Sequence, residues 1–598
     1  MKILRYLMSI TLLISVSSCE KWVLDKKPLN IISDSDVFTD EALIEAYLTQ
    51  VYAQMTIFAN DVNGSGMQGD GYVAVFELNE VSDECLPQWR DAPQSNAYTF
   101  KYGNLNINGG LLDWWGYGTV RVINMFLQKI SDSPLSPEVI VSKTAEARFL
   151  RAFCYFAMAK RYGGVPIITT PQNVDDPEEA LYPARAKEEE VYDFIIAEAE
   201  AASADLPEMQ TGANLGRPSK YAALALKSRA ALYAASIGQF GTVKLNGVVG
   251  IPSARVQGYY QKSLEASKAI MDGGKHALYN ADADKTTNFR NIFLVKNNPE
   301  VIFAKRHDNI SQFAGGSGWS IDFINAPRPN GWGRGMYDQA YLELAEAFEY
   351  VDGRPGALNR TAIQQGVHTM DEIWGDRDPR FYATLYTQGT SWKGDNLAFH
   401  AGLRLPNGTI QTAGSYQGVL ATGNQDYLGT GFGMLKYLNE SHDNMAGASG
   451  NWPDSEQDWQ IFRYAEVLLN YAEAAFELGL TSEAVSAINQ VRDRAGISLL
   501  TSLTREKIHH ERRVELAYEG HRYWDVRRWR TAVRDLSVRW SGLRYILDFE
   551  TKKFQVQILN NFDGTTNIPR FREENYYLPL TNGRTSNNPK LIENPGYQ

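Results

Sequence analysis

The stretch "DWQIFRYAEVLLNYAEAAFELGLTSEAVSAINQVRDRAGI" at residues 458–497 predicts two helices joined by a tight turn. Gly479 ends the first helix, since glycine tolerates the left-handed backbone there, and Thr481 or Ser482 caps the second. Small side chains on the facing sides let the two helices approach closely: Ala472, Ala475, Ala484 and Ala487. The stretch therefore predicts an antiparallel helix pair.

This spacing resembles a tetratricopeptide (TPR) unit, whose period is about 34 residues. A single pair cannot bury its apolar face alone, so further pairs must stack on it. Helical periodicity recurs at residues 39–57, 112–130, 142–161, 187–205, 219–237 and 259–271. We therefore predict a mainly α fold of TPR-like helix pairs, an α-α superhelix.

Between residues 275 and 455 the composition changes. Glycine, asparagine, tryptophan and tyrosine become frequent, and helical periodicity weakens except at 338–350. A long irregular insert in a helical protein is usually functional or disordered, and its aromatic content argues against disorder. The predicted organisation is a helical region at 31–274, an irregular ligand-presenting lobe with minor β structure at 275–455, and a second helical region at 456–598.

The first residues have the pattern of a secretory signal. A basic start is followed by a short apolar run and by Val16-Ser17-Ser18-Cys19, which looks like a bacterial lipobox. The apolar run is shorter than the roughly 20 residues that a membrane span needs. We expect a signal peptide at 1–18, lipidation of Cys19 and a tether at 19–30; the alternative is a plain secretory signal with an incidental cysteine.

Composition and motifs argue against several classes of function. The net charge of −11 gives no electrostatic support for nucleic-acid binding. HExxH, GxSxG and P-loop strings are absent from the sequence, and GxGxxG at 64–69 lacks the strand–helix context of a dinucleotide site. Asp83 and Glu84 could form a glycosidase pair, but adjacent carboxylates usually point apart, so a binding protein is favoured over an enzyme.

The aromatic residues indicate a class of ligand. The chain has 13 tryptophans and 32 tyrosines, and the faces of sugar rings stack on such side chains while their hydroxyls bind planar polar groups. Two stretches, 82–98 and 318–337, combine both kinds of residue. The predicted ligand-binding residues are Trp89, Arg90, Asp91, Asn96, Tyr98, Trp319, Asp322, Asn325, Trp332 and Arg334.

The alternative is that these rings fill the small core of the insert or cap the helices. Two tryptophan pairs in helical context are assigned to the core instead: Trp114 and Trp115, and Trp524 and Trp529.

Several longer strings resemble one known family. "AEARFLRAFCYFAMAKRYGGVPII" (145–168), "GRPSKYAALALKSRAALYAAS" (216–236), 458–479, 484–497, "ERRVELAYEGHRYWDVRRW" (511–529) and the ending at 576–597 resemble SusD/RagB-type outer-membrane nutrient-binding lipoproteins. The resemblance covers nearly the whole chain after residue 18. It implies four TPR-like helix pairs, and an irregular lobe that helps to present an oligosaccharide.

The resemblance also implies partners and a location. The expected partners are an oligosaccharide or polysaccharide and a SusC-like, TonB-dependent transporter, with the protein lipid-anchored in the outer membrane and exposed at the cell surface. No catalysis and no cofactor are expected, and a structural calcium ion in the lobe is left open. The alternatives are a RagAB-like importer of peptides or protein fragments and a surface glycosidase.

The charged residues of the matching strings are expected to serve the scaffold. The resemblance implies that they form buried or half-buried ion pairs between helices: Arg148, Arg151, Arg512, Arg513, Glu515, Arg522 and Asp525.

Overall fold

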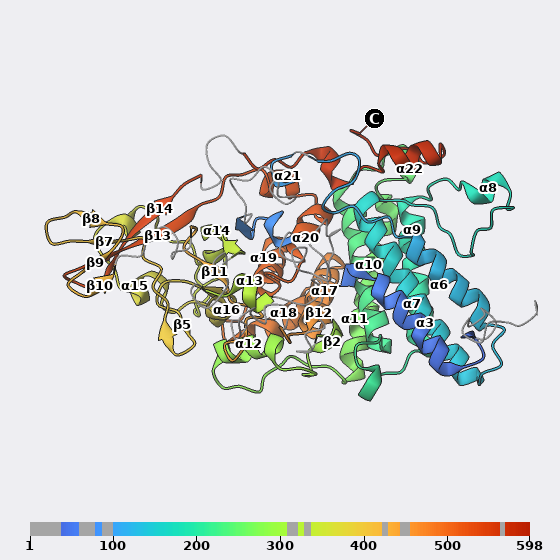
Figure 1. Cartoon of the computed structure of the whole chain (residues 1–598), viewed down its shortest axis with the longest axis horizontal. Coiled ribbons are helices and arrows are strands. Elements are labelled where there is room, and N and C mark those ends of the chain that lie inside the picture. The colour runs from blue at the N-terminus through green and yellow to red at the C-terminus, as the bar shows by residue number, and fades with distance from the viewer. Residues whose placement is uncertain are drawn as a thin grey trace, which may run out of the picture.

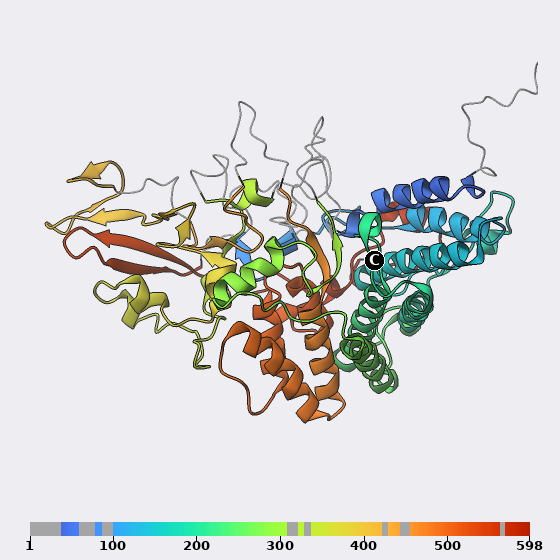
Figure 2. The same ribbon diagram turned by 90° about the horizontal axis from the view of Figure 1, so that it is seen from below.

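A computed structural model describes residues 37–58, 78–86, 100–103, 105–307, 321–327, 337–420, 429–442, 455–561 and 568–597. The molecule is elongated, with a layer of helices at one end and a lobe of short strands and helices at the other (Figure 1). A view at right angles shows the same division (Figure 2). No helix in the described ranges has the length and apolar character needed to cross a bilayer.

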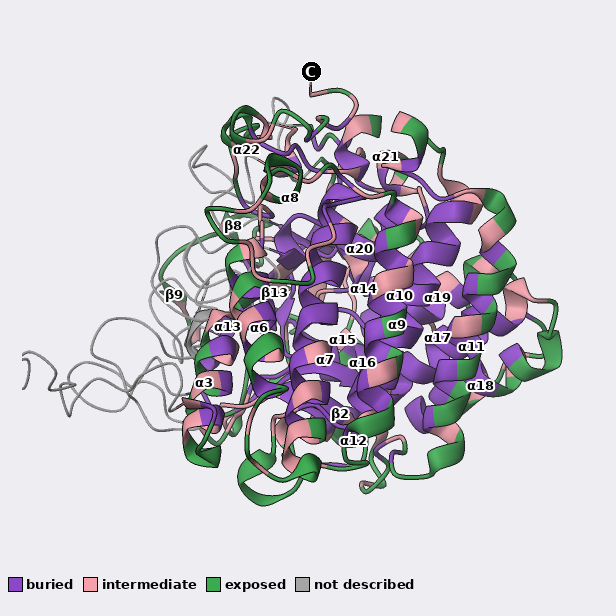
Figure 3. Cartoon of the chain, turned by 90° about the vertical axis from the view of Figure 1, so that its right-hand side faces the viewer, coloured by how far each residue is buried: buried purple, intermediate pink, exposed green. Residues whose placement is uncertain are grey.

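The helical layer confirms the predicted class of fold. Its main helices are α3 (Glu41–Gln54), α6 (Tyr117–Ile130), α7 (Pro137–Tyr162), α9 (Glu188–Asp205), α10 (Lys220–Phe240), α11 (Val256–Gly273), α17 (Tyr464–Glu477) and α18 (Thr481–Ala495). In spatial order α6, α7, α9, α10, α11, α17 and α18 each pack on the next (Figure 3). The layer is therefore continuous in space although the chain leaves it after α11 and returns at α17.

Helices α7 and α10 lie inside this layer and are buried along most of their length. Ser136 caps α7, with Pro137 in its first turn, and Gly163 ends it with a φ of 78°. Alanine recurs along α10, which lets α9 and α11 approach it from two sides. Both helices therefore bury charged side chains as well as apolar ones, such as Arg151 of α7 and Arg229 of α10.

The start of the quoted stretch differs from the prediction. Trp459–Arg463 is a strand, β12, which pairs antiparallel with β2 (Val301–Lys305), and helix α17 begins only at Tyr464. All five β12 residues are buried, including Gln460 and Arg463, so the strand lacks the alternation of apolar and polar residues that would distinguish it from helix. The predicted cap was also wrong: Leu480 precedes α18 without a side-chain hydrogen bond, and Thr481 is its first residue.

The predicted helix at 338–350 is likewise replaced. Strand β3 (Gln339–Ala340) comes first and pairs with β1 (Cys85–Leu86), and only one helical turn follows, α14 (Leu342–Ala345). Pairing with a distant strand holds Gln339 and Ala340 in extended conformation.

The lobe is built from two separate parts of the chain. Strands β7 (Gly402–Arg404) and β8 (Ile410–Gln411) form one sheet with β13 (Gly542–Asp548) and β14 (Phe554–Leu559), in the order β14-β13-β7-β8. Strand β13 runs parallel to β7 and antiparallel to β14. The late β13–β14 hairpin thus returns to the lobe (Figure 1).

Smaller elements complete the described chain. The other helices are α8 (Glu178–Leu181), α12 (Lys285–Leu294), α13 (Ile321–Asn325), α15 (Met370–Trp374), α16 (Pro379–Thr384), α19 (Arg505–Glu515), α20 (Arg522–Arg528), α21 (Ala532–Asp535) and α22 (Asn582–Asn587). The other strands are β4 (Leu385–Tyr386), β5 (Ser391–Trp392), β6 (Asp395–Asn396), β9 (Ser415–Tyr416), β10 (Val419–Leu420) and β11 (Gly433–Met434).

Buried ion pairs connect the helices. They were expected for the charged residues of the sequence stretches that resemble the SusD/RagB family. Glu515 accepts hydrogen bonds from Arg380, Arg463 and Arg494. Arg512 pairs with Asp525 at 2.8 Å, Arg151 pairs with Glu198 at 2.7 Å, and Arg513 and Arg522 both pair with Asp83. Arg148 is the exception, because it is half-buried and pairs with no described carboxylate.

Candidate ligand-binding site

The structure describes two of the ten predicted ligand-binding residues. Trp89, Arg90, Asp91, Asn96, Tyr98, Trp319, Trp332 and Arg334 lie outside the described residues, as does Cys19. Asp322 and Asn325 are described. The structure also describes the residues on either side of the other eight, and these flanking residues locate the candidate site.

The two predicted stretches join the fold side by side. Residues 87–99 follow β1, and residues 328–336 end just before β3. The strands are antiparallel, with Leu86 opposite Gln339 and Cys85 opposite Ala340. Both stretches therefore meet the same end of one short ribbon, although they are more than 200 residues apart in the sequence.

A buried carboxyl group fixes this junction. One oxygen of Asp338 accepts a hydrogen bond from Cys85 Sγ at 3.3 Å, and the other accepts from Asn325 Nδ2 at 3.2 Å. The Asp338 N–H donates to Asn325 Oδ1 at 2.9 Å. Burial raises the pKa of Asp338 to about 7, although hydrogen bonds from Cys85 and Asn325 oppose the rise. Asp338 thus links the ends of both stretches to α13.

Asp322 lies just after the segment 308–320 and binds the residues on both sides of the segment 443–454. Its carboxylate accepts from the Asn439 N–H at 2.7 Å, from Gln457 Nε2 at 2.9 and 2.8 Å, and contacts His442 Nδ1 at 3.0 Å. Its own N–H donates to Ser455 Oγ at 3.1 Å. Asp322 and Asn325 are both buried and bonded to described residues next to these segments, and their direct contact with a ligand stays a prediction.

Lys101 binds the chain at residues 80–85, which lead into and include the start of β1. This lysine was not identified from the sequence. Its buried ammonium donates to the carbonyl oxygens of Glu80 and Ser82 at 3.0 Å and of Cys85 at 2.9 Å. It also lies 4.6 Å from the ring centres of Tyr341 and Trp540. Carbonyl dipoles and ring faces together stabilise the buried charge. A lone lysine gives no sequence signal of such a role.

Asp83 and Glu84, the nominated glycosidase pair, are both buried in contacts with the C-terminal helices. Burial alone would raise the pKa of Asp83, but the guanidinium groups of Arg513 and Arg522 hold it well below its usual range. Glu84 accepts from the Tyr518 N–H at 3.0 Å, and burial raises its pKa to about 7. Their partners show that both carboxyl groups join the β1 region to the scaffold.

The structure describes eight of the 13 tryptophans. Eight lie in the described ranges and none of these is exposed: Trp374, Trp392, Trp459, Trp524, Trp529 and Trp540 are buried, and Trp114 and Trp115 are half-buried against the core. The core assignment of the two tryptophan pairs is therefore confirmed. The remaining five are Trp22, Trp89, Trp319, Trp332 and Trp452.

Trp452 also lies outside the described residues. It belongs to the segment 443–454, whose flanking residues His442 and Ser455 both bind Asp322. The sequence "GASGNWPD" at 447–454 combines glycine, asparagine and tryptophan, as the stretch at 318–337 does.

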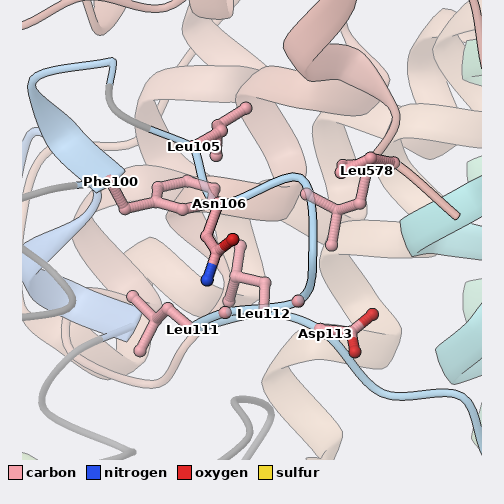
Figure 4. A pocket seen from close by; sticks show the side chains of 10 residues that line it. Phe100, Leu105, Asn106, Leu111, Leu112, Asp113 and Leu578 are labelled. Atoms are coloured by element: carbon pink, nitrogen blue, oxygen red, sulfur yellow. The ribbon is translucent and has the colours of Figure 1, made fainter. Parts of the chain in front are cut away.

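A small cavity opens beside Phe100, the first described residue after 87–99. It encloses about 160 Å³ and has walls of Phe100, Leu105, Leu111, Leu112, Leu578 and Pro579. The Asn106 carboxamide lies among these apolar side chains (Figure 4). The cavity is smaller than the roughly 300–1,000 Å³ of typical ligand pockets, so it cannot enclose an oligosaccharide by itself.

Asp113 borders this cavity but is already bound. Arg584 donates to its two oxygens at 2.6 and 2.7 Å, and the Tyr162 hydroxyl donates at 2.5 Å. Within the described part of the chain no cluster of three or more His, Cys, Asp or Glu side chains could hold a metal ion.

Comparison with known proteins gives a consistent result. Residues 299–597 match the model of the SusD family, and residues 23–232 match a model described as starch-binding associating with outer membrane. SusD-like protein P2 of Formosa agariphila is 24% identical over 540 residues, covering 87% of this chain and 89% of its own.

Two solved structures from Bacteroides fragilis are similar along nearly the whole chain. A SusD-like protein is 26% identical with a TM-score of 0.73, covering 96% of this chain and 100% of its own. A SusD-like carbohydrate-binding protein is 23% identical with a TM-score of 0.69, covering 93% and 100%. With the helical layer, the lobe and these matches in agreement, the chain belongs to the SusD family.

Proposed function

We propose that this protein captures an oligosaccharide or polysaccharide and delivers it, unaltered, to a SusC-like, TonB-dependent transporter. The observation that carries the proposal is the β1–β3 ribbon, which brings the ends of the two aromatic stretches together. The carbohydrate binding described for a structural relative, and the starch-binding description of the matching family model, support a glycan as ligand.

Ring stacking would supply most of the binding. Each sugar–aromatic contact contributes about 1 kcal/mol by analogy with other aromatic pairs, so a few contacts give only modest affinity. Modest affinity suffices if a transporter offers a second binding surface, because a tethered pair of sites raises the effective concentration of the ligand.

The protein would work at the outer membrane. An acylated Cys19 would anchor it, since several buried acyl chains give a stable attachment where one does not. The helical layer would then dock on the transporter while the lobe presents the glycan. The matching family model is described as starch-binding associating with outer membrane, and this description supports the location.

Replacing both Trp89 and Trp319 with alanine tests the ligand site. We expect loss of binding in isothermal titration calorimetry against a glycan that the unaltered chain binds, because two stacking surfaces disappear. The control is Tyr182→Ala, which removes an exposed aromatic ring directly after helix α8. This variant should bind the glycan normally.

Unchanged affinity in the double variant would show that the glycan binds elsewhere. Screening the unaltered chain on oligosaccharides and on peptides in parallel separates glycan capture from peptide capture. Release of reducing ends during incubation with a polysaccharide would instead indicate hydrolysis.

A further inference from the structure

A cavity of about 390 Å³ runs along strand β2. Four consecutive residues of the strand line it: Val301, Ile302, Phe303 and Ala304. Since successive side chains point to opposite faces of a strand, a cavity that touches all four follows the edge of the strand and not one face. Its volume lies within the roughly 300–1,000 Å³ of typical ligand pockets.

This edge of β2 carries no strand in the described part of the chain, where β12 is the one strand paired with β2. The His307 N–H donates to Asp458 Oδ1 at 2.9 Å, just before β12. Backbone groups alternate in direction along a strand, so those of Ala304 point away from β12. The neighbour on that side is the loop at Gly216, where an added Cβ would lie 3.9 Å from the Ala304 carbonyl oxygen.

The loop between α9 and α10, residues 207–218, forms another wall of the cavity. The Lys220 N–H donates to the Pro207 carbonyl at 2.8 Å, so the two ends of the loop are held together. Closed loops of this kind are frequently functional. Met209 and Leu215 of the loop line the cavity and are 42% and 37% exposed. These apolar side chains beside a strand edge can pack on the side chains of an added strand.

The charged side chains favour an acidic partner. Among the described residues that line the cavity, three are basic and one is acidic: Arg217, Lys275, Arg306 and Asp458. Glu45 and Glu146 neutralise Arg217. The side chains of Lys275 and Arg306 are 48% and 31% exposed, and their ion pairs with described carboxylates are long, at 3.5 and 3.9 Å. Both can therefore pair with a carboxylate of an incoming chain.

We propose that the free edge of β2 binds an extended segment of a partner protein, which adds a strand there and carries an apolar side chain and a carboxylate. A strand edge presents N–H and carbonyl groups at the repeat of an extended polypeptide, which the hydroxyls of a sugar ring do not match. Residues 301–304 span about 10 Å, so the cavity holds about three residues of such a segment. The proposal does not depend on glycan capture by the residues around Trp89 and Trp319.

Isothermal titration calorimetry with the N-acetylated tripeptide Leu-Val-Glu tests the proposal. Two matched peptides, methylated on the valine or on the glutamate nitrogen, keep the side chains and charges. Because N–H groups alternate along an extended chain, one of the two methylations removes a hydrogen bond to β2, and that peptide should bind at least about tenfold more weakly. Equal binding of all three peptides, or no binding of the unmethylated one, would overturn the proposal.

A variant and a second readout locate the binding. Leu215→Asp replaces an exposed apolar contact with a charge that repels the peptide, and it should weaken binding about tenfold. Val174→Asp, at an 89% exposed residue outside the cavity, is the control and should bind normally. The unmethylated peptide should also slow hydrogen–deuterium exchange at residues 301–306. Unchanged binding by Leu215→Asp, or slowed exchange at 301–306 with an oligosaccharide and not with the peptide, would refute strand addition at β2.

Discussion

At the residue scale, buried polar side chains rather than apolar contacts determine where the candidate site begins. Asp338 joins β1, β3 and α13 through Cys85 and Asn325, and Lys101 fixes three carbonyl groups of the segment that leads into β1. A buried polar group is favourable only when its hydrogen bonds are made, so each of these contacts specifies one arrangement of the chain. The described residues that flank 87–99 and 328–336 are therefore held in one arrangement.

The raised pKa of Asp338 predicts a pH dependence. Its pKa rises from 3.8 to about 7 on folding, so the folded state holds this proton more tightly. The stabilisation is complete below pH 3.8 and is lost as pH rises through 7, by at most about 4 kcal/mol. Urea denaturation at pH 5 and pH 8 should show a smaller difference in unfolding free energy for Asp338→Asn than for the unaltered chain.

Glu473 gives a pH dependence of stability with the opposite sign, which serves as a reference. Burial alone would raise its pKa, but Arg528 lowers it from 4.5 to about 2, so its stabilisation is present above pH 4.5 and lost as pH falls toward 2. Asp338→Asn should leave this acid limb unchanged. An equal pH 5 to pH 8 difference in both proteins would show that Asp338 is not the titrating group.

At the scale of elements, the end of α7 depends on two glycines. Gly163 has a left-handed φ of 78°, and a Cβ on Gly164 would lie 2.0 Å from the Ala186 carbonyl oxygen and 2.8 Å from that of Val248. Backbone from two later loops therefore packs directly against the helix end. No other residue fits position 164 without moving one of these loops.

Gly164→Ala should destabilise the protein by about 3 kcal/mol, because the added methyl group overlaps backbone atoms. The control is Gly258→Ala on the exposed side of α11, where a Cβ has nothing within 4 Å and removes backbone entropy from the unfolded chain. It should stabilise by up to about 1 kcal/mol. Guanidinium denaturation measures both, and equal midpoints for the two variants would contradict the packing at Gly164.

Elements also show what the sequence could and could not predict. Helices α7 and α10 follow from local periodicity and caps, which are written in consecutive residues. Strand β12 could not be predicted in the same way, because its conformation depends on β2, which lies far away in the sequence. Trp89 and Trp319 led to the prediction of a glycan site, which stays a prediction. The anchoring roles of Asp338 and Lys101 depend on burial, which composition does not reveal.

At the scale of the whole molecule, the helical layer is one unit made from two parts of the chain. Helix α11 packs on α17, and Arg229 of α10 reaches Glu466 of α17 with two hydrogen bonds, at 2.6 Å from Nε and 2.5 Å from Nη2. Both side chains are buried. This ion pair therefore connects the two halves of the layer on either side of the inserted lobe.

Glu466→Gln should cost about 3–5 kcal/mol, because it leaves the buried Arg229 without its charged partner. Asp272→Asn, which breaks the exposed Lys268–Asp272 pair, is the control and should cost less than about 1 kcal/mol. Thermal unfolding followed by circular dichroism and by tryptophan fluorescence should still give coincident transitions. Two separate transitions in the unaltered protein would show that the halves fold independently.

The interruption of the layer has a consequence for biosynthesis. Helix α11 is complete at Gly273, but the helix that covers it starts only at Tyr464. At about 5–20 residues per second, the ribosome needs about 10 to 40 seconds to make the intervening residues 274–463. During that interval the side of α11 that will meet α17 has no partner, so a chaperone has a defined surface and a defined time in which to protect the nascent chain.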